Sequence, residues 1–265
     1  MASNLLHPVL RAGRGKTIWA AYWERANKLN SEAANPLLAR YIELVSLQVR
    51  LGSTLVETLA IPHTDSNRSL LSYFNPEPLC PLLYMAAQEV APNETSGTAD
   101  QSLARLEALW YQSEELHYPH DFAARLVLEV YATELAALPH KEIETTPDRC
   151  PHCGFPILCS IALEEGMGRR RSAVCSICSS EWPVPRLGCL RCGEQRASKL
   201  PVFSFDAWTH IRVEICDSCG GYLKSIDMTK DAEALPVPDD VGSSAINIWA
   251  FEEGYQAIGR HFFNL

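Results

Sequence analysis

Four CxxC pairs near the middle of the chain constrain its fold more than any other feature. They are Cys150/Cys153, Cys175/Cys178, Cys189/Cys192 and Cys216/Cys219, and only Cys80 and Cys159 stand outside them. Disulfide frameworks of this density are typical of short secreted domains, whereas here residues 1–149 hold a single cysteine. In a reducing compartment, this spacing indicates metal binding instead.

The cysteine region is repeated. The gap from Cys153 to Cys175 and the gap from Cys192 to Cys216 each hold two apolar stretches with a turn between them. The last CxxC of each copy precedes an aromatic residue, Trp182 or Tyr222. These features indicate a duplicated unit, which consists of a CxxC turn (a knuckle), a strand, a turn, a second strand and a second knuckle. Copy symmetry then predicts two metal ions, each held by two consecutive knuckles: Cys150, Cys153, Cys175 and Cys178 on one, and Cys189, Cys192, Cys216 and Cys219 on the other.

Four sulfurs suit zinc or a rubredoxin-type iron, and a closed set leaves no position for water or substrate. Such an ion supplies folding free energy to a small module and does not act in hydrolysis. Gly154, Gly193 and Gly220 follow the last cysteine of three knuckles, where a positive φ suits glycine, and Ser179 takes this place in the fourth. A redox-active dithiol would need a thioredoxin-like context that the sequence lacks.

The rest of the chain is helical by pattern. Apolar residues recur at helical spacing over 18–29, 36–59 with Gly52 as a candidate break, 82–91, 103–116 and from about 121. Asn35 and Pro36 form a predicted helix start, and 92–100 a loop. We therefore expect an α plus small β metal module protein: a helical domain over 1–145 that forms a bundle of about four to six helices, a tandem zinc-ribbon or rubredoxin-like module of four-cysteine units over 146–230 (146–185 and 186–230), and a tail over 231–265. The tail is expected to include a helix that packs back on both domains. If the domains fold independently, replacing Cys175 and Cys178 by serine should unfold the metal module and leave the helical domain largely intact.

Charge and hydropathy limit the partners. A net charge of −9 and a pI near 5.4 disfavour nucleic acid and anionic membranes. Without a long apolar run or a secretory signal pattern, we expect a cytoplasmic protein that is not inserted in a membrane. The basic cluster Arg169–Arg171 is interpreted as a solvated hairpin tip, and His152 and His210 as surface residues. No catalytic motif is evident.

The segments CPHCG, RRRSAVCSICSSEW, RLGCLRCGE and EICDSCGGYLK, in this order, resemble the formate dehydrogenase accessory proteins, the FdhE family. The stretches NPLLARYIELVSLQVRL at 35–51 and PDDVGSSAINIWAFEEGY at 238–255 extend the resemblance over most of residues 15–265. It implies a cytoplasmic, non-enzymatic assembly factor that binds the catalytic subunit of an exported respiratory formate dehydrogenase, acting as a chaperone before export by the twin-arginine route. It also implies iron beside zinc as the metal of the same eight cysteines.

Three other functions stay open at this point: a rubredoxin-like electron carrier, a zinc-ribbon nucleic-acid-binding protein, and an enzyme built on the helical part. The sequence does not decide which metal is bound, which surface contacts the partner, or whether the protein forms a homodimer. It also assigns no role to Cys80 or Cys159.

Overall fold

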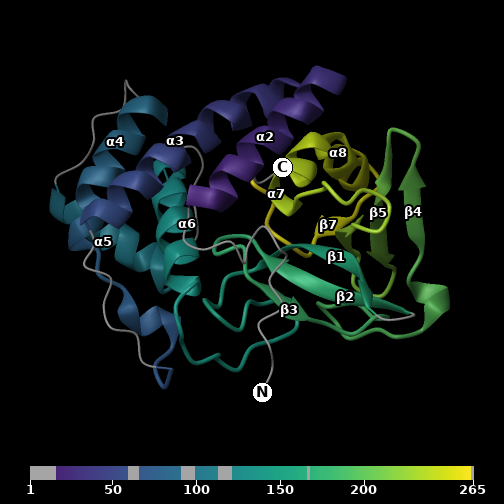
Figure 1. The fold of residues 1–265 in the computed structure, drawn as a ribbon. Helices are drawn as coiled ribbons and strands as arrows, with labels where there is room; N and C mark the ends of the chain where they lie inside the picture. Colours follow the sequence, from purple (N-terminus) through teal and green to yellow (C-terminus); the bar gives the residue numbers. More distant parts are fainter. Residues whose placement is uncertain (1–15, 59–65, 91–98, 113–120, 166–167, 264–265) are drawn as a thin grey trace.

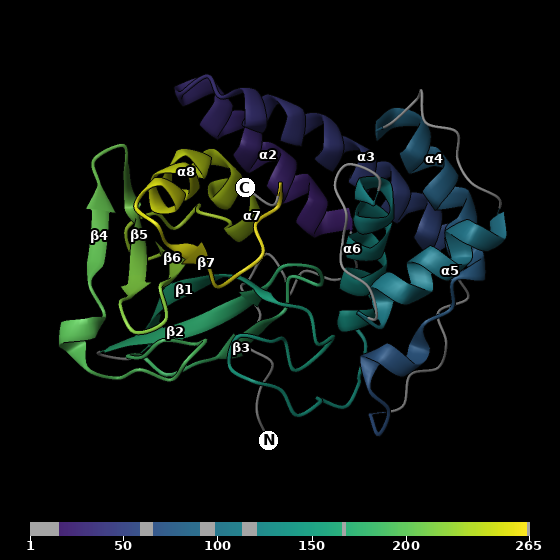
Figure 2. The same ribbon diagram turned by 180° about the vertical axis from the view of Figure 1, so that it is seen from behind.

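The computed structural model describes residues 16–58, 66–90, 99–112, 121–165 and 168–263 (Figures 1 and 2). Its amino-terminal part is helical, and two short 3-10 turns, Leu70–Tyr73 and Glu77–Leu79, precede the helix that begins at Cys80. The α helices are α2 (Lys16–Glu32), α3 (Pro36–Thr58), α4 (Cys80–Val90), α5 (Ala99–Trp110) and α6 (Phe122–Ala136). The predicted amino-terminal helices are therefore confirmed.

Helices α2 and α3 form a hairpin whose start the sequence predicts. The Asn35 side-chain oxygen accepts hydrogen bonds from the backbone N–H groups of Leu37 (2.9 Å) and Leu38 (3.4 Å), which caps α3. Gly52 does not break α3, so that expectation is wrong. A Cβ atom at Gly52 would lie 3.7 Å from both Trp19 and Val130, because other helices pack closely against this turn of α3.

Two predicted boundaries shift. Of the loop expected at 92–100, residues 92–98 lie outside the described residues, and the last two belong to α5. The helix expected at 103–116 ends at Trp110, and Leu116 lies outside the described ranges.

Both cysteine repeats form hairpins in one mixed sheet. Its strands are β1 (Ile157–Glu165), β2 (Gly168–Cys175), β3 (Glu181–Pro183), β4 (Val202–Phe205), β5 (Trp208–Cys216), β6 (Gly221–Asp227) and β7 (Gln256–Ala257). The strand order is β3-β2-β1-β6-β5-β4, and β7 pairs with β6. Each repeat thus supplies three antiparallel strands, in the same internal order.

The two repeats are joined edge to edge, whereas the sequence predicts tandem units with no contact specified between them. Strand β1 of the first copy pairs in parallel with β6 of the second, with Ser160 opposite Ser225 and Ile161 opposite Ile226. This pairing satisfies the backbone groups that each three-stranded unit would otherwise expose at one edge.

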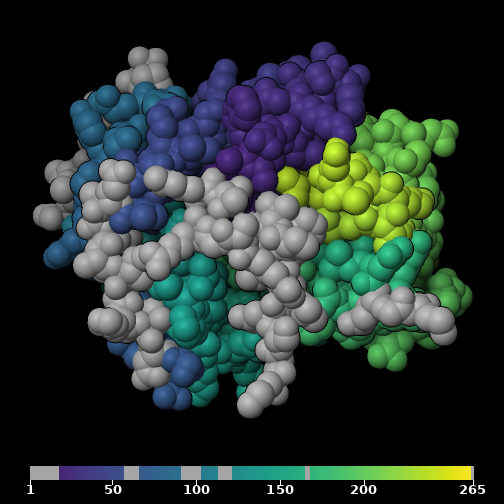
Figure 3. All heavy atoms as spheres, viewed as in Figure 1, coloured from purple at the N-terminus to yellow at the C-terminus, as the bar shows by residue number. Residues whose placement is uncertain are grey.

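The predicted carboxy-terminal helix is α8 (Ser244–Glu252), and a shorter helix that the sequence analysis missed, α7 (Pro236–Gly242), precedes it. Ile246 is buried, and the ring of Trp249 lies 5.2 Å from those of Phe203 and Phe205. In the space-filling view, the yellow tail fills the space between the purple helices and the sheet (Figure 3).

Buried hydrophobic residues of the helices, the sheet and the tail belong to one cluster. The rings of Tyr41 on α3 and Phe262 near the carboxy-terminus, for example, lie 4.9 Å apart, edge to face. The division into 1–145, 146–230 and 231–265 stays a proposal from the sequence. Among the described helices, none combines the length and hydrophobicity needed to cross a bilayer.

Candidate metal centres

The first four-cysteine cluster consists of Cys150, Cys153, Cys175 and Cys178. The Sγ atom of Cys150 lies 3.7 Å from that of Cys178, and the Sγ atom of Cys153 lies 3.4 Å from those of Cys175 and Cys178. A tetrahedral site with metal–sulfur bonds of about 2.3 Å has sulfur–sulfur edges of about 3.8 Å. The cluster therefore has nearly the dimensions that a metal ion requires.

The second cluster consists of Cys189, Cys192, Cys216 and Cys219. Its Sγ atoms lie 3.7 Å apart between Cys189 and Cys219 and 3.6 Å apart between Cys192 and Cys216. The grouping by consecutive knuckles is the one that the repeat predicts. Both clusters could hold a metal ion, since each brings four soft sulfur ligands together.

The knuckles share their local backbone. Gly154, Gly193 and Gly220 donate to the carbonyl of the first cysteine of their own CxxC at 2.8–2.9 Å. Their φ angles are +77°, +75° and +66°, and Ser179 adopts +55° at the fourth knuckle, as the position predicts. The first knuckle of each copy is closed by the same bond, from the N–H of Cys150 to Phe155 and of Cys189 to Glu194, at 2.9 Å each.

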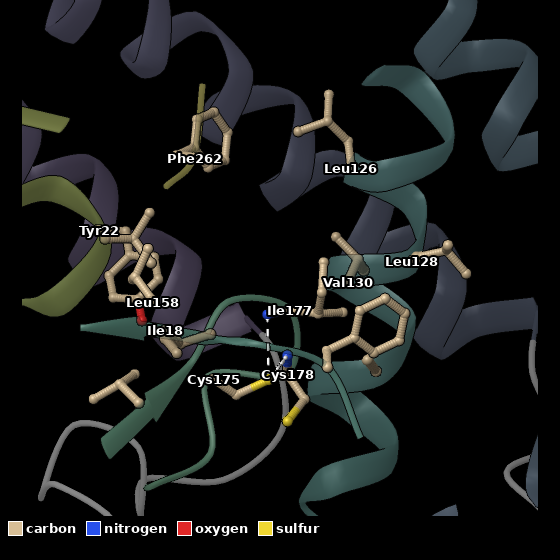
Figure 4. Packing of buried hydrophobic residues seen from close by; sticks show 14 of the residues in the cluster. Ile18, Tyr22, Leu126, Leu128, Val130, Leu158, Cys175, Ile177, Cys178 and Phe262 are labelled. Atoms are coloured by element: carbon tan, nitrogen blue, oxygen red, sulfur yellow. Dashed lines mark hydrogen bonds between the residues drawn. The ribbon is translucent and has the colours of Figure 1, made fainter. Parts of the chain in front are cut away.

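The first cluster lies in the interior, against the helices. Figure 4 shows Cys175, Ile177 and Cys178 between Ile18 of α2 and Val130 of α6. The ring of Phe155, next to the first knuckle, lies 6.4 Å from that of Trp110 on α5. This cluster therefore sits where the sheet meets the helical domain.

The electrostatic surroundings differ among the thiols of the first cluster. Burial raises the pKa values of the Cys150 and Cys153 thiols. Burial also acts to raise the pKa of Cys178, but hydrogen bonds from the other three thiols outweigh it and lower that pKa well below its ordinary value. The backbone N–H groups of Ile177 and Cys178 each donate to the Cys175 sulfur at 3.4 Å. Such donors stabilise the thiolates that a metal needs.

The second cluster lies at the surface. Cys192 is exposed and Cys219 half-buried, whereas Cys189 and Cys216 are buried. Burial raises the pKa of Cys189 to about 12, while a backbone hydrogen bond from Glu194 lowers that of Cys192. A cavity of about 100 Å³ lies beside this cluster and is lined by Cys189, Cys216 and apolar side chains that include Leu187 and Val202.

Two expectations about side chains near the knuckles are wrong. His152 is 6% exposed, and its ring nitrogen Nδ1 lies 2.7 Å from Nε2 of the half-buried His140. Arg171 is also buried and pairs with Glu214, and Arg169 pairs with Asp227 at 3.0 Å. The expectation of a solvated hairpin tip is therefore wrong for Arg171, whereas Arg169 is exposed as expected.

Of the two cysteines outside the knuckles, Cys159 is buried in β1 and Cys80 begins α4. Neither belongs to the four-cysteine groups.

A further cleft lies between the α2–α3 hairpin and the second repeat. It encloses about 560 Å³ and is lined by Ala34 and Asn35 from the connection between α2 and α3 and by Trp208 and His210 from β5. At its base, Nε2 of His210 lies 2.8 Å from Asp239, so this histidine is half-buried and not a surface residue. The side chains of His210, Asp231 and Asp239 are of kinds that can bind a metal ion, and their ligand atoms lie within 4.8 Å of one another.

This histidine–aspartate group does not fit a metal ion. The guanidinium of Arg25 donates to Asp231 and to Asp239 at 2.6 Å, so it already neutralises the carboxylates. The sequence analysis did not identify Arg25 and Asp239 as members of this group. Arg25 could have been found, because an arginine on the apolar stripe of the first helix is expected to be buried and to need a carboxylate partner.

A set of helices joined to a sheet of two fused four-cysteine ribbons defines a candidate metal-binding protein, and comparisons with known proteins narrow the class. The model of the FdhE carboxy-terminal domain matches residues 187–264. An FdhE homolog of Shewanella oneidensis is 27% identical over 90% of this chain and 86% of its own. One of Aquifex aeolicus is 32% identical over 43% of this chain and 40% of its own.

The fold agrees. The crystal structure of the FdhE protein from Pseudomonas aeruginosa matches 93% of this chain and 95% of its own with a TM-score of 0.68 at 21% identity. The chain is therefore similar to FdhE proteins over about 90% of its length, and its carboxy-terminal part matches the FdhE carboxy-terminal domain.

Proposed function

We propose that the chain is a cytoplasmic accessory factor that binds the catalytic subunit of a formate dehydrogenase during its maturation and turns over no substrate itself. The observation that carries this proposal is the pair of complete four-cysteine clusters in a chain that is similar to FdhE homologs over most of its length. A four-sulfur set has no open position for a substrate, so each metal ion serves structure or exchange, not hydrolysis.

The proposed cofactors are two ions of iron or zinc per chain. Cys150, Cys153, Cys175 and Cys178 would hold one ion, and Cys189, Cys192, Cys216 and Cys219 the other. The sulfur–sulfur distances of 3.4–3.7 Å support this assignment. Elemental analysis of protein purified without oxygen should find two equivalents per chain, and fewer than one would contradict the assignment.

The proposed partner contact is the cleft between the α2–α3 hairpin and the second repeat. It is the kind of concave surface that can hold a segment of another chain, and its walls come from the helical domain, β5 and the tail. Arg25, Asp231 and Asp239 tie these elements together at its base, so the walls keep a fixed spacing.

Co-expression with the catalytic subunit tests the proposal directly. A tagged form of this chain should retain the formate dehydrogenase catalytic subunit and should not retain an unrelated oxidoreductase expressed at the same level. The purified chain should show no formate oxidation. If the chain fails to retain the catalytic subunit both with metal and without it, the proposal is wrong.

An electron-carrier function is favoured by one observation, the exposure of Cys192, because electron transfer requires a centre near the surface. A reversible one-electron titration of the iron-loaded chain, without retention of the catalytic subunit, would support that alternative.

A further inference from the structure

The two four-cysteine centres differ in their surroundings although their knuckles are copies. In the first centre, Cys150, Cys153 and Cys175 are 0% exposed and Cys178 is 3% exposed. In the second, Cys192 is exposed and Cys219 half-buried. The equivalent positions Cys153 and Cys192 therefore lie at opposite extremes of burial.

The first centre is enclosed by the helical domain. A Cβ atom at Gly154 would lie 3.1 Å from the Gln112 side chain, and the Tyr22 hydroxyl donates to Ser179 at 3.3 Å. Two of its knuckles are thus covered by residues from different helical segments. A reagent can reach these sulfurs only when the sheet separates from the helices, which requires extensive opening of the core.

The second centre is held mainly by its own loops. Ser218 donates to Glu194 at 2.6 Å and so connects the two knuckles at the surface. The tail supports one side, where the backbone N–H of Gln256 donates to the Gly220 carbonyl at 2.8 Å. The opposite sides stay accessible, through Cys192 to solvent and through the adjoining cavity to Cys189 and Cys216.

We propose that the second centre is an exchange site, whose metal ion is released to or shared with an incoming thiolate, and that the first is a structural site whose ion stays bound. The inference rests on the proposed metal binding. In the exchange step, the incoming thiol loses its proton and its sulfur bonds to the metal. The Cys192 sulfur leaves the metal and takes up a proton, so charge and oxidation state are unchanged. A thiolate ligand is the class expected, because it matches the softness of the ligand it replaces.

The cavity beside the centre fits such an incoming ligand. Its apolar lining, Leu187, Leu190, Leu200 and Val202, can accommodate the carbon atoms of a thiol. Arg186 at its rim is exposed and offers a positive charge to an approaching thiolate.

The test uses the full chain loaded with two equivalents of zinc and a chromogenic chelator added with a small thiol. One equivalent should leave at least about a hundredfold faster than the other, with helical circular dichroism unchanged after the fast phase. Pulsed alkylation with mass spectrometry should label Cys192 and Cys219 in the fast phase and the four cysteines of the first centre only in the slow one. Equal release rates, or earlier labelling of the first centre, would overturn the exchange assignment.

Matched variants assign the fast and slow phases of zinc release to the two centres. Cys192→Ser should remove the fast equivalent and leave the slow one, whereas Cys153→Ser, at the equivalent position of the other copy, should disturb the fold. Should Cys153→Ser fail to fold, the alkylation order in the unmodified chain still decides the question. A chain that binds no zinc at all would instead refute the metal proposal itself.

Discussion

The ammonium nitrogen of Lys224 lies 2.6 Å from a carboxylate oxygen of Asp240, and both side chains are 1% exposed. Lys224 lies on β6, in the last strand of the second repeat, and Asp240 lies on α7 of the tail. His261 adds a second contact, because its Nδ1 lies 2.8 Å from the same oxygen. This buried group joins the metal-binding sheet, α7 and the carboxy-terminal residues.

Breaking this pair should cost much stability. We expect Lys224→Met to lower the free energy of unfolding by about 3–5 kcal/mol, because it leaves Asp240 buried with one partner fewer. The double variant Lys224→Met/Asp240→Leu should be less destabilised than the sum of the single changes. Urea unfolding measures both. A suitable control is Arg40→Met, which breaks an exposed pair with Glu43 and should have a far smaller effect.

Acid should weaken the same group. Burial acts to raise the pKa of Asp240, but His261 and Lys224 outweigh it and hold that pKa well below its usual range. A carboxyl whose pKa is depressed on folding stabilises the protein above its unfolded pKa of about 3.9, and this stabilisation is lost as the pH falls through the folded pKa. The stability difference between the unmodified chain and Asp240→Asn should therefore shrink as the pH falls below about 4. A difference that grows below about pH 4 would contradict this assignment.

Docking of the tail should depend on Gly259. A Cβ atom there would lie 2.6 Å from the carbonyl oxygens of both Ile157 and Leu158, which are backbone atoms of β1. We expect Gly259→Ala to displace the tail and to lose the hydrogen bond from Arg260 N–H to the Ile157 carbonyl, which is 2.8 Å long. Faster amide hydrogen exchange at residues 256–262 would report this displacement.

Gly52→Ala is the matched control for that substitution. Its Cβ would meet Trp19 and Val130 at 3.7 Å, an ordinary contact, and alanine favours a helix over glycine by about 1 kcal/mol. We expect unchanged or increased thermal stability and unchanged exchange in the tail. Equal effects of the two alanines would show that the contact with β1 does not hold the tail.

Loss of the first centre should affect the helices as well. Cys175 and Cys178 belong to the same buried cluster as Ile18 and Val130. For this reason we expect Cys175→Ser/Cys178→Ser to reduce helical circular dichroism and to broaden thermal unfolding. Unchanged helical signal would instead show that the helical section is stable alone, as the sequence by itself predicts.

Filling the cleft should weaken partner capture. Ala34 is exposed at the cleft wall, so Ala34→Trp can be accommodated without disturbing the core. We expect this variant to retain less of the formate dehydrogenase catalytic subunit at equal expression. Ala20→Trp, on an exposed position of α2 that does not line the cleft, should retain the normal amount. If both variants capture the subunit equally, the partner binds elsewhere.

Spacing along the chain was enough to predict the local parts of both centres. Each CxxC knuckle closes within a few residues, and each hairpin brings two neighbouring knuckles together, so the pairing of Cys150 with Cys175 needs no distant contact. The positive φ of Ser179 could be predicted for the same reason, because it follows from the turn and not from the surroundings. Helix starts such as Asn35 are likewise set by neighbouring residues.

Only the tertiary structure decided how these parts are placed. The chain by itself determined two equivalent four-cysteine units behind a set of helices, because hydrophobic period and cysteine spacing are short-range properties. It did not determine that β1 would pair with β6, that Lys224 would meet Asp240, or that Cys153 would be buried while Cys192 is exposed. Those differences depend on which surfaces the helices and the tail cover. Contacts between residues far apart in the sequence leave no periodic signal, so two copies of one motif acquired different environments that the motif alone cannot show.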